Sequence, residues 1–352
     1  MACDHPVMTP IEGPLAIGAT NPSVATPVAG SPGLFVSNAP EQICSGNNTR
    51  NEGGNGAWPF LDGPWTLNRV SLTNLGPFGN APQRVRVFLW HVSRFRIPSY
   101  FGICVYSNFP GNTSISNIKG HVHNGPVPDI SGPGNCLADA QLAGTLDALN
   151  PSTIPLTAQT ESVIWSAQVE ARIGTNNEVY NLIAAVIEFD IVGSPLDITI
   201  RSAVSITGQT AASFGNYQTP LADNRNNYGT AERHVRGYWP HADITMNLPG
   251  ELDATLLNPP PKLKEWQLCY NDNGVYGPEG EYFSVNNSKA DKLDVLLERP
   301  NPAAYGANLT YRGTFHNYSP TVGAHVHACI QARSVREKYF GRHTWRLKGN
   351  HS

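Results

Sequence analysis

The chain has 352 residues, of which only 14% are charged, and its formal net charge is −3 at pH 7. Ordinary globular proteins carry about 25% charged residues. The deficit, together with 33 Gly and 29 Pro, predicts an all-β protein with long loops, because Gly, Pro and small polar residues favour turns and strands over helices. The small net charge excludes a global field that attracts nucleic acid. No run of about 20 apolar residues is present, so no membrane span is expected.

Residues 1–60 are predicted to form an extended N-terminal arm. Proline recurs in this segment at Pro10, Pro14, Pro22, Pro27, Pro32 and Pro40. Proline at this spacing disfavours helices and central strands. No charged residue falls between Glu12 and Glu41, and apolar residues are spread through the interval. Such an arm is expected to lie on a protein surface, either that of its own domains or that of another subunit.

Residues 61–207 read as a first antiparallel β-sandwich. Apolar residues alternate in Arg84–Trp90 and again over 196–206, which is the period of a half-buried strand. The other expected strands are Phe101–Ser107, Ile115–His123, Ser162–Arg172 and Glu178–Val192. Cys136–Leu149 is the one expected helix. Several strands at this spacing are typical of a sandwich.

The second half repeats this pattern after a polar break. Residues 208–230 are predicted to be a linker, and residues 231–352 a second sandwich with strands such as His241–Asn247 and Leu309–Phe315. The sequence therefore predicts two antiparallel β-sandwich domains, immunoglobulin-like or jelly-roll-like, preceded by the arm.

Six scattered cysteines form no C-x-x-C pair: Cys3, Cys44, Cys104, Cys136, Cys269 and Cys329. Their even number is compatible with disulfides, and pairing between neighbours in sequence gives Cys3–Cys44, Cys104–Cys136 and Cys269–Cys329. Buried free thiols are the alternative.

Two His-x-His pairs are the sharpest candidate site: His121 with His123, and His325 with His327. On a strand, residues i and i+2 share a face, so each pair offers two imidazoles to Zn²⁺ or Cu²⁺. A complete site needs further ligands, for which His91 and His316 are candidates. The alternative is a polar strand face without metal, and no other cofactor is expected.

The stretch Gly120–Pro126 resembles the His-x-His strand of copper/zinc superoxide dismutases and of chordin-type repeat domains, which implies a β-sandwich. The remaining dismutase ligands have no match downstream, so dismutase activity is not expected. A second resemblance, to large secreted bacterial surface proteins of unknown function, covers Trp90–Arg94, Tyr100–Asn108, Gly132–Gly134 and Asn226–Gly229. It implies a surface location and assigns no activity.

Motifs of catalysis are missing from the sequence. It has no Gly-x-Ser-x-Gly elbow and no phosphate-binding Gly-rich loop before a helix. Glu188 and Asp190 share one face of an apolar strand, and an edge position or an ion pair with Arg201 accounts for them. Tyr228, Tyr238 and Trp239 form the best local group for stacking on a glycan, with packing as the alternative.

These features predict a non-enzymatic structural surface or coat protein that self-assembles into a filament, sheath or layer through strand or arm exchange between subunits. Its partner is then another copy of itself, and its location is extracellular or the surface of a cell, spore or particle. The alternative is a secreted β-sandwich module that binds a glycan, or a divalent metal through the His-x-His strands.

Overall fold

In the computed structural model the chain divides into two compact units. One unit comprises residues 1–30 and 243–343, and the other comprises residues 31–242 and 344–352. The described residues are 24–38, 42–45, 57–60, 63–73, 83–95, 97–108, 113–127, 131–150, 153–171, 180–193, 197–220, 236–239, 242–253, 306 and 308–316. Each unit is considered by itself.

A nine-stranded sheet forms one layer of the larger unit. Its main path runs β10-β8-β12-β6-β2-β14, with β3, β4 and β9 attached at the sides. Its strands are β2 (Gly33–Ser37), β3 (Gln42–Ser45), β4 (Ala57–Phe60), β6 (Gln83–Ser93), β8 (Ser114–Val127), β9 (Asp147–Asn150), β10 (Ile154–Pro155), β12 (Tyr180–Val192) and β14 (Arg236–Trp239). The three long strands β8, β12 and β6 pair antiparallel at its centre.

A four-stranded sheet forms the second layer, in the order β11-β7-β13-β5. Its strands are β5 (Trp65–Thr73), β7 (Ser99–Ser107), β11 (Glu161–Val169) and β13 (Asp197–Ser205). All neighbouring strands pair antiparallel. In this order β11 and β5 are the outer strands among those described. A bulge between Val163 and Trp165 twists β11.

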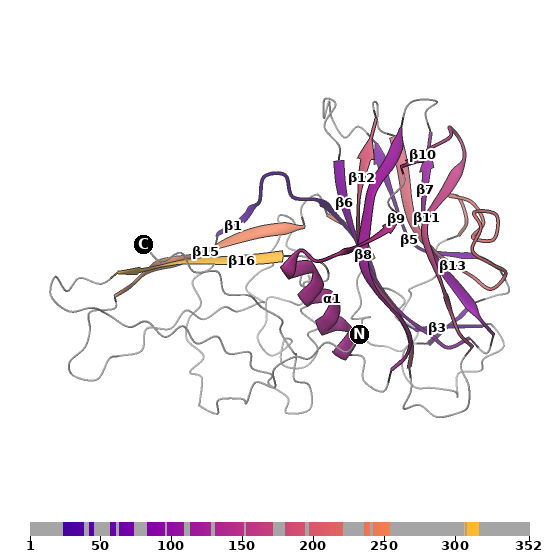
Figure 1. The fold of residues 1–352 in the computed structure, drawn as a ribbon, viewed down its shortest axis with the longest axis horizontal. Helices are drawn as coiled ribbons and strands as arrows, with labels where there is room; N and C mark the ends of the chain where they lie inside the picture. Colours follow the sequence, from indigo (N-terminus) through magenta and orange to yellow (C-terminus); the bar gives the residue numbers. More distant parts are fainter. Residues whose placement is uncertain are drawn as a thin grey trace. The chain divides into compact units, whose positions relative to one another are not determined.

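The two sheets form two layers (Figure 1), and the main apolar core lies between them. The long strands alternate between the layers in chain order, from β5 in the small sheet to β6 in the large one and so on to β13. Within each strand every second residue points inward. Ile198, Ile200 and Val204 of β13 lie in this core, as their alternation predicts. The all-β prediction is confirmed, and this unit has the two packed layers of a sandwich.

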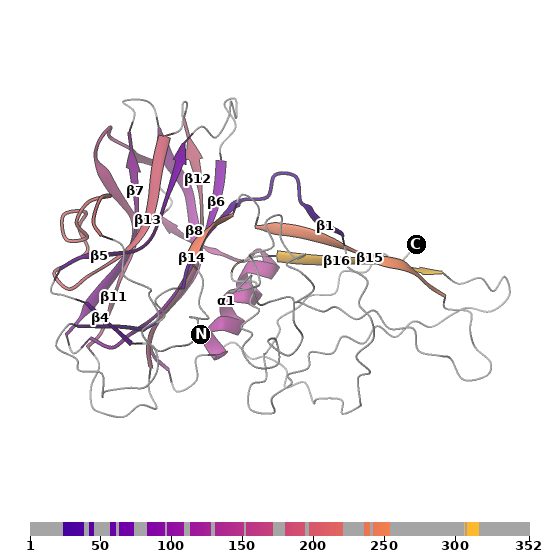
Figure 2. The same ribbon diagram turned by 180° about the vertical axis from the view of Figure 1, so that it is seen from behind.

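Helix α1 (Ser131–Ala143) packs on the outer face of the large sheet, against β8 and β12 (Figure 2). A Cβ placed on Gly134 comes within 3.4 Å of the Trp90 ring, so the start of the helix rests on β6. The predicted helix was Cys136–Leu149. The observed helix begins earlier, at Ser131, and the last residues of the predicted range belong to strand β9. Within the described ranges, no helix is long and apolar enough to cross a membrane.

The described part of residues 31–60 does not support the predicted arm. These residues include β2, β3 and β4, and β2 lies inside the large sheet between β6 and β14. Leu34, Phe35 and Val36 are buried there. The prolines did not prevent strands of four or five residues, and β2 and β3 pair with β6, which lies far away in the sequence.

The smaller unit contains a three-stranded sheet among its described residues. β15 (Asp243–Asp253) pairs antiparallel with β1 (Val24–Pro27) and parallel with β16 (Asn308–His316). The expected strands His241–Asn247 and Leu309–Phe315 correspond to β15 and β16, and β15 begins two residues later, at Asp243. The other strands of the predicted second sandwich lie outside the described residues, and a second sandwich is not supported.

Candidate functional site

Ion pairs line the outer face of the large sheet, on its three central strands. Arg84 donates from Nε to Asp190 over 2.9 Å, and Arg86 donates from Nε to Glu188 over 2.8 Å. Lys119 of β8 reaches the second oxygen of Glu188 at 3.3 Å. Glu188 and Asp190 thus belong to a central strand and do not pair with Arg201, so both expectations for them were wrong.

The charges of this face stabilise one another. Burial alone would raise the pKa of Glu188, but the charge and hydrogen bond of Arg86, with help from Lys119, hold that pKa below its ordinary value. The pKa of Asp190 is also lowered. Burial alone would raise it, but hydrogen bonds from Arg84 and Asn117 outweigh that effect. Both carboxylates are therefore ionised acceptors and are already engaged.

The first His-x-His pair continues this face along β8. His121 lies opposite Val186 and His123 opposite Ala184 of β12. The Nε2 atom of His123 is buried and has no hydrogen-bond partner among the described residues. Burial lowers the pKa of His123, as does the charge of His121, whereas a hydrogen bond with the Gly125 backbone opposes the shift. The side chain is thus held neutral.

Further metal ligands do not join this pair within the described part of the chain. That part contains no group of three or more His, Cys, Asp or Glu side chains able to hold an ion. His91 is fully buried and stacks on Phe101 at 5.9 Å, on the inner side of the sheet. It therefore cannot complete the first pair. His325 and His327 lie outside the described residues, as does the side chain of His316.

A serine and a histidine meet inside the sandwich. The Ser37 hydroxyl lies 2.9 Å from Nε2 of His91 and 2.7 Å from the Ser202 hydroxyl. All three side chains are fully buried. A nucleophile needs access to substrate, so this group serves to join the two sheets by hydrogen bonds.

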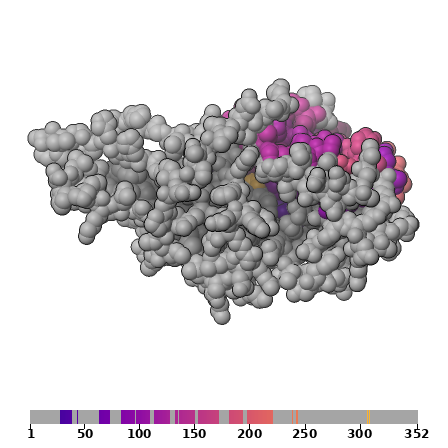
Figure 3. Space-filling view, turned by 90° about the horizontal axis from the view of Figure 1, so that it is seen from below, coloured from indigo at the N-terminus to yellow at the C-terminus, as the bar shows by residue number. Residues whose placement is uncertain are grey.

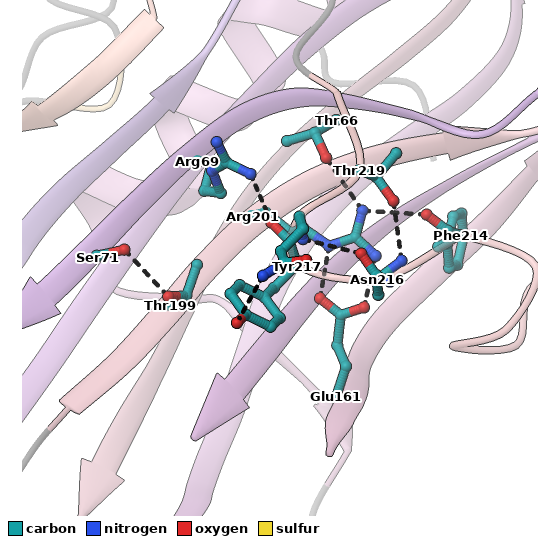
Figure 4. A network of polar contacts seen from close by, with 11 residues as sticks. Thr66, Arg69, Ser71, Glu161, Thr199, Arg201, Phe214, Asn216, Tyr217 and Thr219 are labelled. Carbon is teal, nitrogen blue, oxygen red and sulfur yellow. Dashed lines mark hydrogen bonds and ion pairs between the residues drawn. The ribbon is translucent and has the colours of Figure 1, made fainter. Parts of the chain in front are cut away.

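Arg201 dominates the outer face of the small sheet (Figure 4). Its guanidinium, which is fully buried, makes a bidentate ion pair with Glu161 of β11. Its third nitrogen donates to the Thr66 hydroxyl over 3.2 Å and to the Phe214 carbonyl over 3.1 Å. One side chain therefore links β13 to β5, to β11 and to the segment after β13.

That segment, residues 206–220, folds back onto the small sheet. Phe214 packs against Gly102, where a Cβ would lie 2.6 Å from the ring. Tyr217 stacks on Tyr106 with ring centroids 4.0 Å apart, and its carbonyl accepts a hydrogen bond from Arg69. Described residues 208–220, which were predicted to begin a linker, belong to the same compact unit as the sandwich.

Cys104 lies beneath this segment as a buried free thiol. Burial raises its pKa to about 12; the nearby Glu161 adds to the shift and Arg201 opposes it. The thiol is therefore protonated at neutral pH and a poor nucleophile. The predicted Cys104–Cys136 disulfide is not formed, and the free-thiol alternative holds for Cys104. Cys136 lies in α1. Cys3, Cys269, Cys329 and the side chain of Cys44 lie outside the description.

Among the residues that the structure describes, the outer edge of β11 has backbone groups without a partner. β11 pairs with β7 on one side, and over Ser162–Ala167 no described backbone group bonds to the other side. Beyond that stretch the edge is closed, because Asn124 donates to the Gln168 carbonyl and Asn181 to the Glu170 carbonyl. These carbonyls point away from β7. Residues two apart in an antiparallel strand direct their backbone groups to the same side. The N–H and C=O of Ser166 therefore also point outward.

No family model, curated protein or solved structure matches this chain. The resemblances to dismutases, chordin-type domains and bacterial surface proteins therefore stay predictions.

The sequence reasoning missed the Arg201–Glu161 pair and the open edge of β11. An arginine in the apolar alternation of β13 was the signal for the first. The open edge of β11 had a weaker signal. The stretch from Ser162 to Val169 contains no charged residue and no proline, and these are the residues that usually prevent another strand from pairing with an edge. Tyr228 lies outside the described residues, and Tyr238 packs partly buried against the core.

Proposed function

We propose that this chain is a non-enzymatic structural protein that assembles with copies of itself by adding a strand to the open edge of β11. The observation that carries the proposal is the row of outward backbone groups over Ser162–Ala167. The described ion pairs on the two outer faces already satisfy their charged groups, whereas this edge has donors and acceptors to offer.

Three properties make β11 a suitable acceptor. Its position is fixed, since Glu161 at its first residue is held by the buried Arg201. Its only charge is that carboxylate, so no free charge repels an incoming strand. Most of its side chains are half-exposed, apart from the buried Ile164 and Val169, and Trp165 and Ala167 lie partly buried at the rim of the core. Exposed edges of this kind are templates for strand pairing.

The expected energetics favour assembly through many equal contacts. Each hydrogen bond contributes about 0.5–1.5 kcal/mol net, so a short added strand gives a modest interface that the apolar rim strengthens. If the donor and acceptor surfaces of one copy differ, the contact propagates into a filament or layer. A net charge of −3 over 352 residues keeps repulsion between copies low. An extracellular or surface location is part of the proposal.

The test compares Ser166→Pro with Ser166→Ala in the full chain. Proline removes the outward N–H and is tolerated on edge strands, while alanine removes only the hydroxyl, which contacts Gln209 at 3.4 Å. We expect wild type and Ser166→Ala to form large particles in light scattering and electron microscopy under non-reducing conditions. Ser166→Pro should remain single copies with an unchanged unfolding temperature. A wild-type chain that stays monomeric at all concentrations contradicts the proposal, as does a Ser166→Pro variant that assembles normally.

A second candidate function is divalent metal binding through His121 and His123. The buried Nε2 atom of His123 without a partner favours it. Metal analysis of the purified protein tests it: near-stoichiometric Zn or Cu that is lost in His123→Gln supports a site, and a metal-free protein that takes up neither ion excludes one.

A further inference from the structure

We infer that the strand received by β11 is the segment Leu15–Asn21 of a second copy. The inference rests on the proposed function, because it names the partner for the same edge. Leu15–Asn21 is the interval between Pro14 and Pro22, and it lies outside the described residues.

The first 60 residues supply strands wherever the structure describes them in continuous runs. β1 adds to β15, β2 adds to β6, and β3 and β4 pair with each other beside β6. These are short uncharged pieces, each of four or five residues, in a segment interrupted by prolines. Leu15–Asn21 has the same composition, and we assign it the same role on a sheet of another copy.

Donor and acceptor match in length and charge. Leu15–Asn21 contains seven residues and the open stretch Ser162–Ala167 contains six. Neither has a free charge, since Glu161 beside the stretch is bound to Arg201. Proline at both ends of the donor limits pairing to this interval, because proline has no N–H for a ladder. On the acceptor, the open stretch ends where the Asn124 side chain donates a hydrogen bond to the Gln168 carbonyl.

The side chains also fit. Alternation places Leu15 and Ile17 on one face of an extended donor and the small residues Ala16 and Gly18 on the other. The acceptor presents Trp165 and Ala167, which are only partly buried against the core. Leu15 and Ile17 would cover this rim. Gly18 adapts to the twist that the bulge after Val163 imposes on β11.

The donor comes from another copy because its tether is short. Only Pro22 and Ser23 separate Leu15–Asn21 from β1, which begins at Val24. Two residues span about 7 Å, so pairing within one chain requires β1 to lie beside β11. A second copy is free of this constraint, and the proposed assembly supplies one.

A photo-cross-linker tests the assignment in the assembled full chain. p-Benzoylphenylalanine replaces Ser166, the particles are illuminated, and the products are separated on a reducing denaturing gel and mapped by mass spectrometry. We expect a ladder of covalent multimers with the cross-link inside Leu15–Asn21. A cross-link to that segment in monomers only shows pairing in cis and overturns the inference. A ladder mapped to β5 or β11 of another copy, or assembled particles without a cross-link in residues 1–23, also overturns it.

A pair of donor variants separates this inference from the proposed function. Ile17→Pro breaks the donor and should abolish large particles, whereas the matched Ile17→Val should assemble as wild type. If wild type assembles, Ser166→Pro does not, and Ile17→Pro does, the donor is wrong while assembly at β11 stands. If wild type never assembles, the proposed function itself fails.

Discussion

Arg201 of β13 reaches across β7 to form a buried bidentate ion pair with Glu161 of β11. The strand between them contributes Gly102 and Cys104 to this face, so small residues clear the path of the guanidinium. The pair therefore fixes the outermost strand of the small sheet to a strand two positions away (Figure 4). It makes β11 a rigid edge, which an acceptor for a second strand requires.

Breaking this pair should strongly destabilise the sandwich. We expect Arg201→Met to lower the free energy of unfolding by about 3–5 kcal/mol, because it leaves the Glu161 carboxylate buried without its partner. Denaturant unfolding measures the change. Arg69→Met is the matched control: Arg69 is half-exposed and makes one hydrogen bond to Tyr217, so the expected loss is about 1–2 kcal/mol.

The double variant Arg201→Met with Glu161→Leu should recover part of the loss, because neither charge is then left alone. Equal effects of Arg201→Met and Arg69→Met would show that the buried pair has no special weight.

The contact between Gly102 and Phe214 makes a second prediction. A Cβ at Gly102 would lie 2.6 Å from the Phe214 ring, so Gly102→Ala should displace the 206–220 segment. We expect a loss of about 1–3 kcal/mol, as for other overpacked sites. Gly132→Ala is the control, since nothing lies within 4 Å of the added methyl in α1, and its effect should be small. Thermal unfolding of the two variants gives the comparison, and a stable Gly102→Ala variant would contradict it.

The alternation of apolar residues predicted the strands of the sandwich because this pattern is local. β6, β7 and β13 all lie where Val85, Ile103 or Ile200 and their neighbours alternate. The same pattern also predicts the orientation of His91. It is separated from Val85 and Leu89 by an even number of residues on β6, so its side chain points into the core as theirs do. That signal was available, and reading it would have excluded His91 as a ligand beside His121.

The pairing between strands that are distant in the chain could not be predicted from local sequence patterns. An ion pair with Arg201 was one of the two explanations expected for Glu188 and Asp190. Arg201 lies on the other sheet, and the two carboxylates bind Arg86 and Arg84. Which carboxylate meets which arginine depends on the order of strands in each layer, and that order follows from the whole chain. β2 was missed for the same reason, because its short run becomes a strand only beside β6. The surface of the sandwich unit in Figure 3 combines residues from many parts of the sequence.

Cys104 should be unreactive in the native protein. Its pKa is raised to about 12 by burial, so almost no thiolate exists at pH 7–8, and the segment around Phe214 covers it. Mass spectrometry after iodoacetamide treatment should find Cys104 unmodified in native protein and modified in denaturant. Labelling of Cys104 under native conditions, at the rate of a small-molecule thiol, would show that the covering segment opens readily.

Stability should fall on acidification in two separate windows. The pKa of His123 is lowered from 6.5, chiefly by burial, so the native state resists protonation more than the unfolded state does. The free energy of unfolding is then flat above about pH 6.5 and decreases as pH falls toward the lowered native pKa. The charged and titratable groups of the same face are Arg84, Arg86, Lys119, His121, Glu188 and Asp190, and a positive charge on His121 disfavours a proton on His123. Asp190 has its pKa lowered from 3.8, so its contribution is complete above that pH and is lost only as pH falls further.

Two variants distinguish these windows. His123→Gln should remove part of the decrease that begins below about pH 6.5 and leave the decrease below pH 4 unchanged. Asp190→Asn should lower stability at neutral pH, where its ion pair with Arg84 is lost, and flatten only the region below about pH 4. Denaturant unfolding across pH 3–8 measures both. If His123→Gln has the same pH profile as wild type, the imidazole is not shielded from protonation, and its buried Nε2 atom must find a partner in solution.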